Sequence, residues 1–263
     1  MLVAFQGEHG AFSDDVAGQF FPGAQTRGFD TFDALAAAVA EGPADFAVMP
    51  VENSISGSIP RVYDLLWTYP DLVVVDEIVY RVVQNLIAVP GTRIEDIREV
   101  RSHPVALEQC RGFLSKHPDW HAVIVADTAG AVRAMMQAGD PSSASIGSAI
   151  AARRYGAAVL APGIQDINDN FTRFLLVTRN GSARRNLGRA CIALTLSNRP
   201  GSLHEALAAF AEGKLNLRSL VSRPTNDDPF TYRFYCEVEN VNAETLGAAL
   251  GRIDGTSRIL GLY

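Results

Sequence analysis

Short apolar segments alternate with helical ones along the first part of the chain, and this alternation limits the folds that the chain can adopt. The apolar runs at residues 2–6 and 45–51 predict buried strands. Between them, Ser13 is suited to cap a helix through Phe20, and Thr31 to cap a helix that ends at Gly42. A further helix is expected at residues 56–69. Strands and helices in alternation are typical of parallel βαβ units. The sequence therefore predicts an α/β fold.

A second set of strands and helices follows a β-rich stretch at residues 72–89, which ends at Pro90 and Gly91. Its elements are expected near residues 99–104, 105–115, 122–126, 128–138, 145–147, 158–161 and 170–179. Two similar α/β sets joined by extended segments predict two lobes with a cleft between them. Ligand sites favour clefts of this kind.

The composition changes at residues 179–189 (RNGSARRNLGR), which are polar, basic and free of acids. We interpret this segment as a linker. After it the pattern becomes strand, helix, strand, strand, helix, strand, which is the ferredoxin-like βαββαβ order. We expect its sheet to have one face covered by helices and one free edge, and a free edge favours pairing with another subunit.

The charged residues indicate a small anionic ligand rather than a nucleic acid. The net charge is −6 and the pI about 5.4, so the chain lacks the basic character of nucleic-acid-binding proteins. Of the 23 basic residues, only Lys116 and Lys214 are lysines. Arginine binds carboxylates bidentately, whereas imine chemistry needs lysine. We therefore expect a carboxylate ligand and no pyridoxal phosphate.

The cysteines and the N-terminus predict a reduced, cytoplasmic protein. Cys110, Cys191 and Cys236 are far apart in the sequence, odd in number and without metal-ligand spacing, so we expect buried thiols. The N-terminus has no basic segment of a signal peptide. No apolar run reaches the ~18 residues of a membrane span. We expect no metal site and no membrane contact.

A cluster of polar and small residues follows the strand predicted at residues 45–51, and it contains Glu52, Asn53, Ser54 and Gly57. In α/β proteins the loop between the end of a strand and the next helix is a common anion site, because its backbone N–H groups are exposed. Asn53 and Ser54 are therefore candidates to hold a carboxylate. The alternative is that they only cap the following helix.

A second cluster lies at the start of the last strand of the second set, where Thr172 and Arg173 precede Phe174. A hydroxyl beside a guanidinium, at the mouth of a buried strand, can combine a proton donor with a carboxylate clamp. The alternative is a threonine and an arginine that face solvent.

A third cluster, Ser102 and His103 before Pro104, marks another strand-to-helix junction. His103 is a candidate acid or base, and the alternative is that it packs at the start of the helix. Two further helix openings, at residues 127–130 and 146–148, are also placed to direct N–H groups at the cleft.

Taken together and in order, these segments resemble the prephenate dehydratase family over nearly the entire chain. Residues 7–13 (GEHGAFS) are similar to its opening motif, residues 51–57 (VENSISG) to V-E-N-S-x-x-G, residues 102–107 (SHPVAL) to S-H-P-x-A-L, and residues 172–174 to its T-R-F signature. The resemblance implies an α/β catalytic domain at residues 1–179, two-lobed like type II periplasmic binding proteins. One lobe comprises about residues 1–80 with 165–179, and the other about residues 81–164.

The C-terminal segment, residues 190–263, resembles an ACT domain joined through a linker at residues 180–189. Residues 201–207 are similar to G-A-L-x-x-x-L, with Ser202 in place of alanine. Residues 222–224 are similar to the end of E-S-R-P, with Val221 where the acid is expected. The resemblance implies L-phenylalanine as an effector at a subunit interface of a homodimer or homotetramer. The effector-binding residues are then Gly201, Ser202, Leu203, Leu207, Ser222, Arg223 and Pro224.

The resemblance implies a carbon–oxygen lyase that converts prephenate to phenylpyruvate in phenylalanine biosynthesis, without a metal or an organic cofactor. Thr172 then donates a hydrogen bond to the departing hydroxyl, Arg173 clamps the side-chain carboxylate, and Asn53 and Ser54 anchor the other polar end. Further substrate contacts are expected from Glu52, Gly57, Ser102, His103 and Phe174. Two alternatives stay open: an arogenate dehydratase and a non-enzymatic amino-acid-binding protein.

Overall fold

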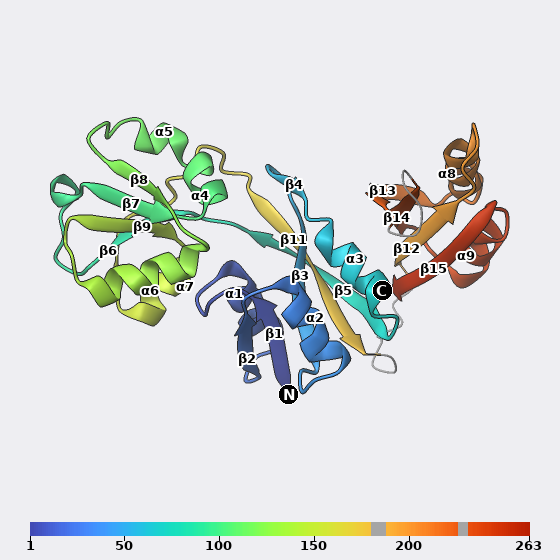
Figure 1. Ribbon diagram of the computed structural model, residues 1–263, viewed down its shortest axis with the longest axis horizontal. Coiled ribbons are helices and arrows are strands. Elements are labelled where there is room, and N and C mark those ends of the chain that lie inside the picture. Colours follow the sequence, from blue (N-terminus) through green and yellow to red (C-terminus); the bar gives the residue numbers. More distant parts are fainter. Residues whose placement is uncertain (180–187, 226–230) are drawn as a thin grey trace.

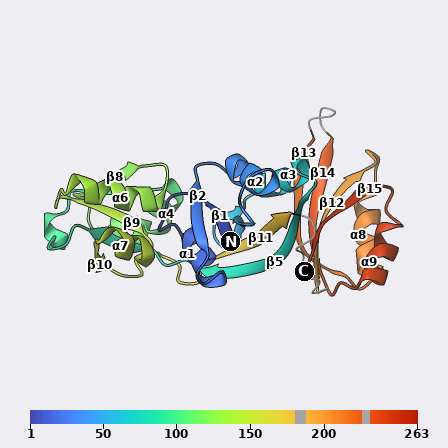
Figure 2. The same cartoon turned by 90° about the horizontal axis from the view of Figure 1, so that it is seen from below.

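The computed structural model describes residues 1–179, 188–225 and 231–263, and its ribbon forms three units in a row. The two α/β lobes lie at one end and in the middle, and the C-terminal domain lies at the other end (Figure 1). A view turned by 90° shows the same order (Figure 2). Most of the predicted linker, residues 180–187, lies outside the described residues.

The first lobe is a mixed sheet with three helices. Its strand order is β5-β11-β3-β1-β2, in which β1 pairs in parallel with β2 and β3, while β11 runs antiparallel to both β3 and β5. The elements are β1 (Leu2–Gln6), α1 (Phe12–Phe20), β2 (Gln25–Phe29), α2 (Phe32–Ala40), β3 (Phe46–Asn53), β4 (Gly57–Ser58), α3 (Arg61–Thr68), β5 (Leu72–Arg81) and β11 (Phe171–Arg179).

The second lobe is a five-stranded sheet of order β10-β6-β9-β7-β8. The chain enters it after β5 and returns before β11, so two extended segments join the lobes. Its elements are β6 (Asn85–Ala88), a 3-10 helix (Ile94–Asp96), β7 (Glu99–Ser102), α4 (Pro104–Gln109), α5 (Arg111–Leu114), β8 (His121–Ile124), α6 (Thr128–Ala138), β9 (Ser143–Gly147), α7 (Ala149–Tyr155) and β10 (Ala158–Ala161).

The C-terminal domain has the predicted βαββαβ order: β12 (Arg189–Leu196), α8 (Ser202–Glu212), β13 (Asn216–Pro224), β14 (Tyr232–Glu239), α9 (Ala243–Leu250) and β15 (Gly255–Leu262). Its strands are ordered β13-β14-β12-β15, and β13 forms the outer edge. At the inner edge, β15 pairs with β5 through Gly261 and Val74, so this sheet continues into the sheet of the first lobe.

Both faces of the C-terminal sheet are covered, although the sequence predicted helices on one face only. Alternate strand residues such as Ile192 and Cys236 pack with α8 and α9. The opposite face packs on α3 of the first lobe, where the rings of Tyr235 and Tyr63 stack with centroids 5.4 Å apart. The first lobe and the C-terminal domain therefore share a hydrophobic core.

Three local predictions are corrected. The helix expected from Ser56 begins only at Arg61, because β3 extends to Asn53 and turns into β4. Strand β2 was missed because its sequence, QTRGF, has no apolar run. The N-cap of α1 is Ala11 rather than Ser13. None of the helices in the described ranges is long and apolar enough to cross a membrane.

Candidate active site

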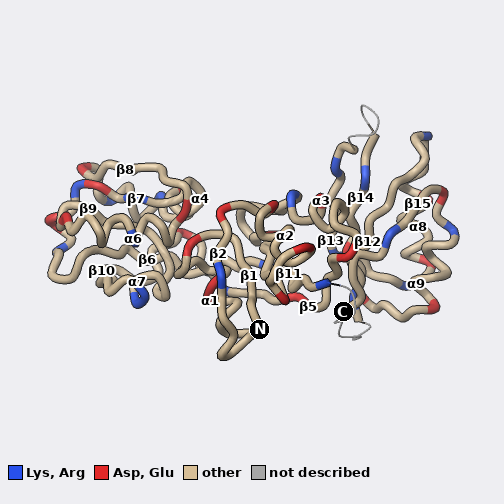
Figure 3. The backbone as a smooth tube through the Cα atoms, turned by 60° about the horizontal axis from the view of Figure 1, so that its bottom comes forward, with Lys and Arg blue, Asp and Glu red and all other residues tan. Residues whose placement is uncertain are grey.

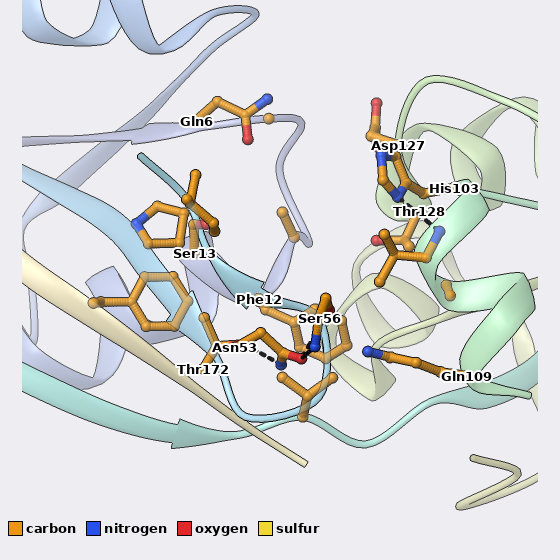
Figure 4. Close-up of a pocket in the computed structure, with 18 of the residues that line it drawn as sticks. Gln6, Phe12, Ser13, Asn53, Ser56, His103, Gln109, Asp127, Thr128 and Thr172 are labelled. Atoms are coloured by element: carbon orange, nitrogen blue, oxygen red, sulfur yellow. Dashed lines mark hydrogen bonds between the residues drawn. The ribbon is translucent and has the colours of Figure 1, made fainter. Parts of the chain in front are cut away.

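A cleft of about 410 Å³ lies between the two lobes. Figure 4 shows the first lobe presenting Gln6, Ser13, Asn53 and Thr172 on one side, and the second lobe presenting His103, Gln109 and Thr128 on the other. The further lining residues are Gly7, Ala11, Phe12, Pro50, Ser56, Gly57, Ser58, Ile59, Val82, Gln84, Val105, Ala106, Ala126, Asp127 and Phe174.

The polar centre of the first-lobe wall is the pair of Thr172 and Asn53, which lie opposite each other on β11 and β3. Asn53 Nδ2 donates a hydrogen bond to Thr172 Oγ1 over 3.0 Å. Thr172 therefore uses an oxygen lone pair in this bond and keeps its hydroxyl proton. No acceptor for that proton occurs among the described residues, so it is available to a ligand in the cleft.

The loop after β3 fixes the orientation of the Asn53 amide. Asn53 Oδ1 accepts hydrogen bonds from the backbone N–H groups of Ile55 and Ser56 and from the Ser56 hydroxyl. This is the Asx-type turn that asparagine favours. The amide nitrogen must then point toward Thr172. The alternative prediction that Asn53 caps a helix is wrong, since α3 begins eight residues later at Arg61.

A chain of side-chain amides continues from Asn53 to the second lobe. Asn53 Nδ2 also donates to Asn170 Oδ1 over 2.7 Å, and Asn170 Nδ2 donates to Gln109 Oε1 over 3.0 Å. Gln84 Nε2 donates to the same Gln109 oxygen over 3.2 Å. Because its oxygen receives two donors, Gln109 directs its own Nε2 into the cleft, as Figure 4 shows. Gln109 is thus a hydrogen-bond donor of fixed orientation, opposite Thr172.

Gln84 and Gln109 were not predicted from the sequence. Gln84 belongs to an extended segment between the lobes and carries no motif. Gln109 had a usable signal, because His103, the N-cap of α4, is followed at intervals of three residues by Ala106 and Gln109, and all three line the cleft.

Arg173 does not lie in the cleft, so its predicted role as a substrate clamp is wrong. Neighbouring residues of a strand point to opposite faces of the sheet. Thr172 and Phe174 line the cleft, whereas the Arg173 side chain points to the other face and is only 7% exposed. There it donates to Glu52 Oε2 over 2.9 Å and to Glu77 Oε2 over 3.1 Å.

Arg173 also pairs with Glu237 of the C-terminal domain. Burial by itself lowers the pKa of Arg173, but the charge of Glu237 and the hydrogen bonds with Glu237 and Glu52 more than offset this effect and raise the pKa above its ordinary value. Tyr63 donates to the same carboxylate over 2.5 Å, and burial together with the Glu237 charge raises the pKa of Tyr63 well above its usual range.

The remaining predicted residues divide between the cleft and the framework. Gly57, His103 and Phe174 line the cleft, and His103 also caps α4 by accepting from the Val105 N–H. Ser54 donates to the Asp169 carbonyl and Ser102 to the Ile146 carbonyl, and neither serine lines the cleft. Glu52 also lies outside the cleft lining and pairs with Arg173.

The cleft carries no lysine or arginine among the residues that line it, so an anion must be held by neutral donors and helix N-termini. The N–H groups of Phe12 and Ser13 open α1 without a described acceptor, and Ala11 supplies no side-chain cap. Ser13 is 7% exposed, and none of the described hydrogen bonds involves its hydroxyl. Thr128, the first residue of α6, lines the second-lobe side of the cleft, so the N-terminus of α6 lies there. Helix N-termini stabilise negative charge.

The loop after β1 holds the two lobes together beside the cleft. Arg133 pairs with Glu8 over 2.8 Å, Tyr155 donates to the His9 carbonyl over 2.6 Å, and Ser148 donates to the Gly10 carbonyl over 2.6 Å. Gly10 has a φ of +94°, and a Cβ there would come within 2.9 Å of the Ala151 Cα. Glycine is therefore required at this close approach of the lobes.

The predicted effector residues lie at one end of the C-terminal sheet. Gly201, with a φ of +89°, caps α8, and Ser202 and Leu203 begin that helix. Leu207 borders a separate hollow between α8 and β13. Ser222, Arg223 and Pro224 end β13, and Arg223 pairs with Asp64 of α3 over 2.8 Å, so the S-R-P segment contacts the first lobe directly.

Two α/β lobes around a polar cleft, followed by a βαββαβ domain, define a fold like that of type II periplasmic binding proteins with an attached ferredoxin-like domain. The family model for prephenate dehydratase matches residues 3–182, and the chain belongs to this family.

Relatives and solved structures agree with this assignment. The chain is 37% identical to arogenate dehydratase/prephenate dehydratase 2 of Arabidopsis thaliana, over 99% of this chain and 72% of the relative. It is 32% identical to a bifunctional N-acyl-homoserine lactone acylase/prephenate dehydratase of Komagataeibacter europaeus, over 100% and 95% of the two chains. The structure of prephenate dehydratase from Arthrobacter aurescens in complex with L-Phe has a TM-score of 0.89 at 29% identity, covering 99% of this chain and 89% of the other.

Proposed function

We propose that the cleft converts prephenate to phenylpyruvate, carbon dioxide and water. The observation that supports this most directly is the Thr172 hydroxyl, which faces the cleft, accepts from Asn53 and has its proton available. Relatives that match nearly the whole of this chain carry the same activity in their names. The family match and the cleft favour this enzyme over a non-enzymatic binding protein.

The reaction needs one proton and a correctly oriented substrate. The electron pair of the bond between the ring and its carboxylate moves into the ring as carbon dioxide leaves. A second pair departs with the ring hydroxyl, which takes up a proton and leaves as water. The ring becomes aromatic, and this supplies the driving force. Thr172 donates a hydrogen bond to the departing oxygen, and a positioned donor of this kind contributes roughly 10²–10⁴-fold to the rate.

A cleft without lysine or arginine suits the loss of a carboxylate. A guanidinium paired with the departing carboxylate would stabilise the substrate more than the transition state, in which that charge disperses. We assign the side-chain carboxylate to the N–H groups of Phe12 and Ser13 and the Ser13 hydroxyl. The Gln109 amide is assigned to the opposite end of the substrate.

Regulation and assembly belong to the same proposal. We assign residues 190–263 as an ACT domain that binds L-phenylalanine between subunits of a homodimer or homotetramer. The Arthrobacter aurescens relative, which binds L-Phe, supports the effector, and the outer edge strand β13 supports subunit pairing. We also propose the division into residues 1–179, 180–189 and 190–263, and a cytoplasmic location, where the three free cysteines would stay reduced.

A product assay with two substrates tests the proposal. The purified protein is incubated with prephenate and, separately, with arogenate, which carries an amino group in place of the side-chain keto group. We expect phenylpyruvate from prephenate at a higher kcat/KM than phenylalanine from arogenate. Preference for arogenate would identify the chain as an arogenate dehydratase, and the absence of both products would refute the dehydratase function.

A further inference from the structure

We propose that Glu237, a residue of the C-terminal domain, is a positioning residue for the reaction in the cleft. It acts by holding β11, which carries Thr172, and α3, which follows the loop that begins at Asn53. This inference rests on the proposed function, because its effect is measured on prephenate turnover.

Glu237 is a buried carboxylate whose described partners both belong to the first lobe. Its side chain is 4% exposed. One carboxylate oxygen, Oε1, accepts from the Tyr63 hydroxyl of α3 over 2.5 Å, and the other, Oε2, accepts from Arg173 of β11. A carboxylate is costly to bury unless it is paired and hydrogen-bonded, so these two contacts fix the C-terminal sheet against both elements.

The contact with Arg173 affects Thr172 because the two residues are adjacent on β11 and pair with adjacent residues of β3. On β11 and β3, Arg173 pairs with Glu52, and the adjacent positions pair Thr172 with Asn53. The two pairs lie on opposite faces of the same two strands: the ion pair faces Glu237, and the Thr172–Asn53 hydrogen bond faces the cleft. A shift of Arg173 therefore moves the backbone that carries Thr172.

The contact with Tyr63 affects a second part of the same site, the loop and β4 that precede α3. α3 follows directly after the loop and β4, whose residues Ser56, Ser58 and Ile59 line the cleft. Tyr63 is 1% exposed and stacks on Tyr235, so its hydroxyl has little freedom to choose another partner. Glu237 thus links β11, which forms one part of the cleft wall, to α3 and the loop before it, which form another part.

The surrounding charges support a local role for Glu237. Glu77, with a 2% exposed side chain, pairs with Arg173, Arg189 and Arg218. Figure 3 shows acidic and basic positions close together where β5 and β11 meet the C-terminal strands. Glu239, two residues after Glu237 on β14, lies within 3.6–3.7 Å of Arg189 and Arg218 but has no described contact with Arg173 or Tyr63. It is therefore a matched control.

The experiment measures kcat and KM for prephenate in Glu237→Gln and Glu239→Gln. A displaced reacting group can reduce the rate by up to about 10²-fold, so we expect Glu237→Gln to reduce kcat by about 10- to 100-fold with KM within about twofold of wild type. Glu239→Gln is expected to retain wild-type kcat. Equal kcat values in the two folded variants would overturn the inference while leaving the dehydratase function intact. A wild-type protein that makes no phenylpyruvate would instead refute the dehydratase function itself.

A double-mutant cycle distinguishes positioning from general damage. If Glu237 acts through Thr172, Glu237→Gln has little further effect on the residual kcat of Thr172→Ala. Independent, multiplying effects would overturn the inference.

If Glu237→Gln does not fold, Tyr63→Phe removes only the hydroxyl that Glu237 accepts from. We then expect a loss of about three- to tenfold in kcat, the equivalent of one hydrogen bond, with Tyr69→Phe as control. An unchanged kcat in Tyr63→Phe would then count against the inference.

Discussion

Thr172 and Arg173 are neighbours on β11, but their side chains serve opposite faces of the sheet. Thr172 faces the substrate cleft, while Arg173 joins buried carboxylates that connect the first lobe to the C-terminal domain. At the residue scale, the position of each side chain within the strand's alternation decides its role, and chemical type alone does not.

The Asn53 amide can be tested by a substitution that keeps its oxygen and replaces its N–H donor with a negatively charged oxygen. In Asn53→Asp, a carboxylate oxygen still accepts from the Ile55 and Ser56 N–H groups, but nothing donates to Thr172. We expect kcat for prephenate to fall about 10- to 100-fold. The exposed Asn168→Asp variant carries the same change outside the cleft and should keep wild-type kcat; a wild-type kcat in Asn53→Asp would remove Asn53 from the site.

Arg173→Lys tests the corrected role of the guanidinium. A lysine cannot reach Glu52, Glu77 and Glu237 together, so we expect the free energy of unfolding in urea to fall by about 1–3 kcal/mol. KM for prephenate should stay near the wild-type value. Arg179→Lys, exposed on the same strand, is the control. A large rise in KM without loss of stability would return Arg173 to substrate binding.

At the scale of elements, the cleft depends on where segments from different units meet. The loop after β1 is bonded to α6 and α7 of the second lobe, and α3 packs on the sheet of the C-terminal domain. The cleft wall is therefore fixed from outside the first lobe at two places.

Gly10→Ala tests the contact between the lobes. A methyl group would lie 2.9 Å from the Ala151 Cα, so the lobes must separate, and we expect kcat/KM to fall about tenfold or more. Gly91→Ala is the matched control, because Gly91 also has a positive φ, +90°, but has nothing within 4 Å of its Cβ position. Both variants experience backbone strain, and only Gly10→Ala should lose activity. Equal kcat/KM values would show that the close approach is unimportant.

At the scale of the whole molecule, local sequence patterns predicted the elements better than their contacts. Thr31 caps α2 as expected, and α6 occupies the predicted range. These elements depend on nearby residues. The pairing of Arg173 with Glu237 joins residues 64 positions apart, and no local pattern encodes it. For the same reason the packing of α3 on the C-terminal sheet was not predicted.

The candidate site was predicted in part. Thr172 and Asn53 were placed correctly beside the cleft because both belong to motifs at strand ends. Arg173 was misplaced because proximity in sequence was taken for proximity in space. Gln84 was missed because its role depends on Gln109 of α4 and on Asn170, which only the fold brings together with it.

The buried thiols make the free energy of unfolding depend on pH in the alkaline range. Burial raises the pKa of Cys236 to about 12, and burial together with the Asp166 charge raises that of Cys110 to about 12. In the unfolded chain these thiols ionise near pH 8.5. Between these values the unfolded chain loses protons that the folded chain keeps, so the free energy of unfolding falls as pH rises.

Urea denaturation at neutral pH and at about pH 10 checks this expectation. The buried phenols of Tyr63 and Tyr263, whose pKa values are also raised, act in the same direction. Cys236→Ala should reduce the difference between the two pH values. A free energy of unfolding that rises with pH would contradict the assignment.

In the proposed reaction, Thr172 assists the departure of the ring hydroxyl. The most direct measurement is the rate of phenylpyruvate formation from prephenate in Thr172→Ala, with Thr178→Ala on the same strand, bonded to the Asp45 carbonyl away from the cleft, as control. We predict that kcat falls roughly 10²–10⁴-fold in Thr172→Ala with little change in KM, while Thr178→Ala stays active. A Thr172→Ala protein with the kcat of wild type would contradict the account.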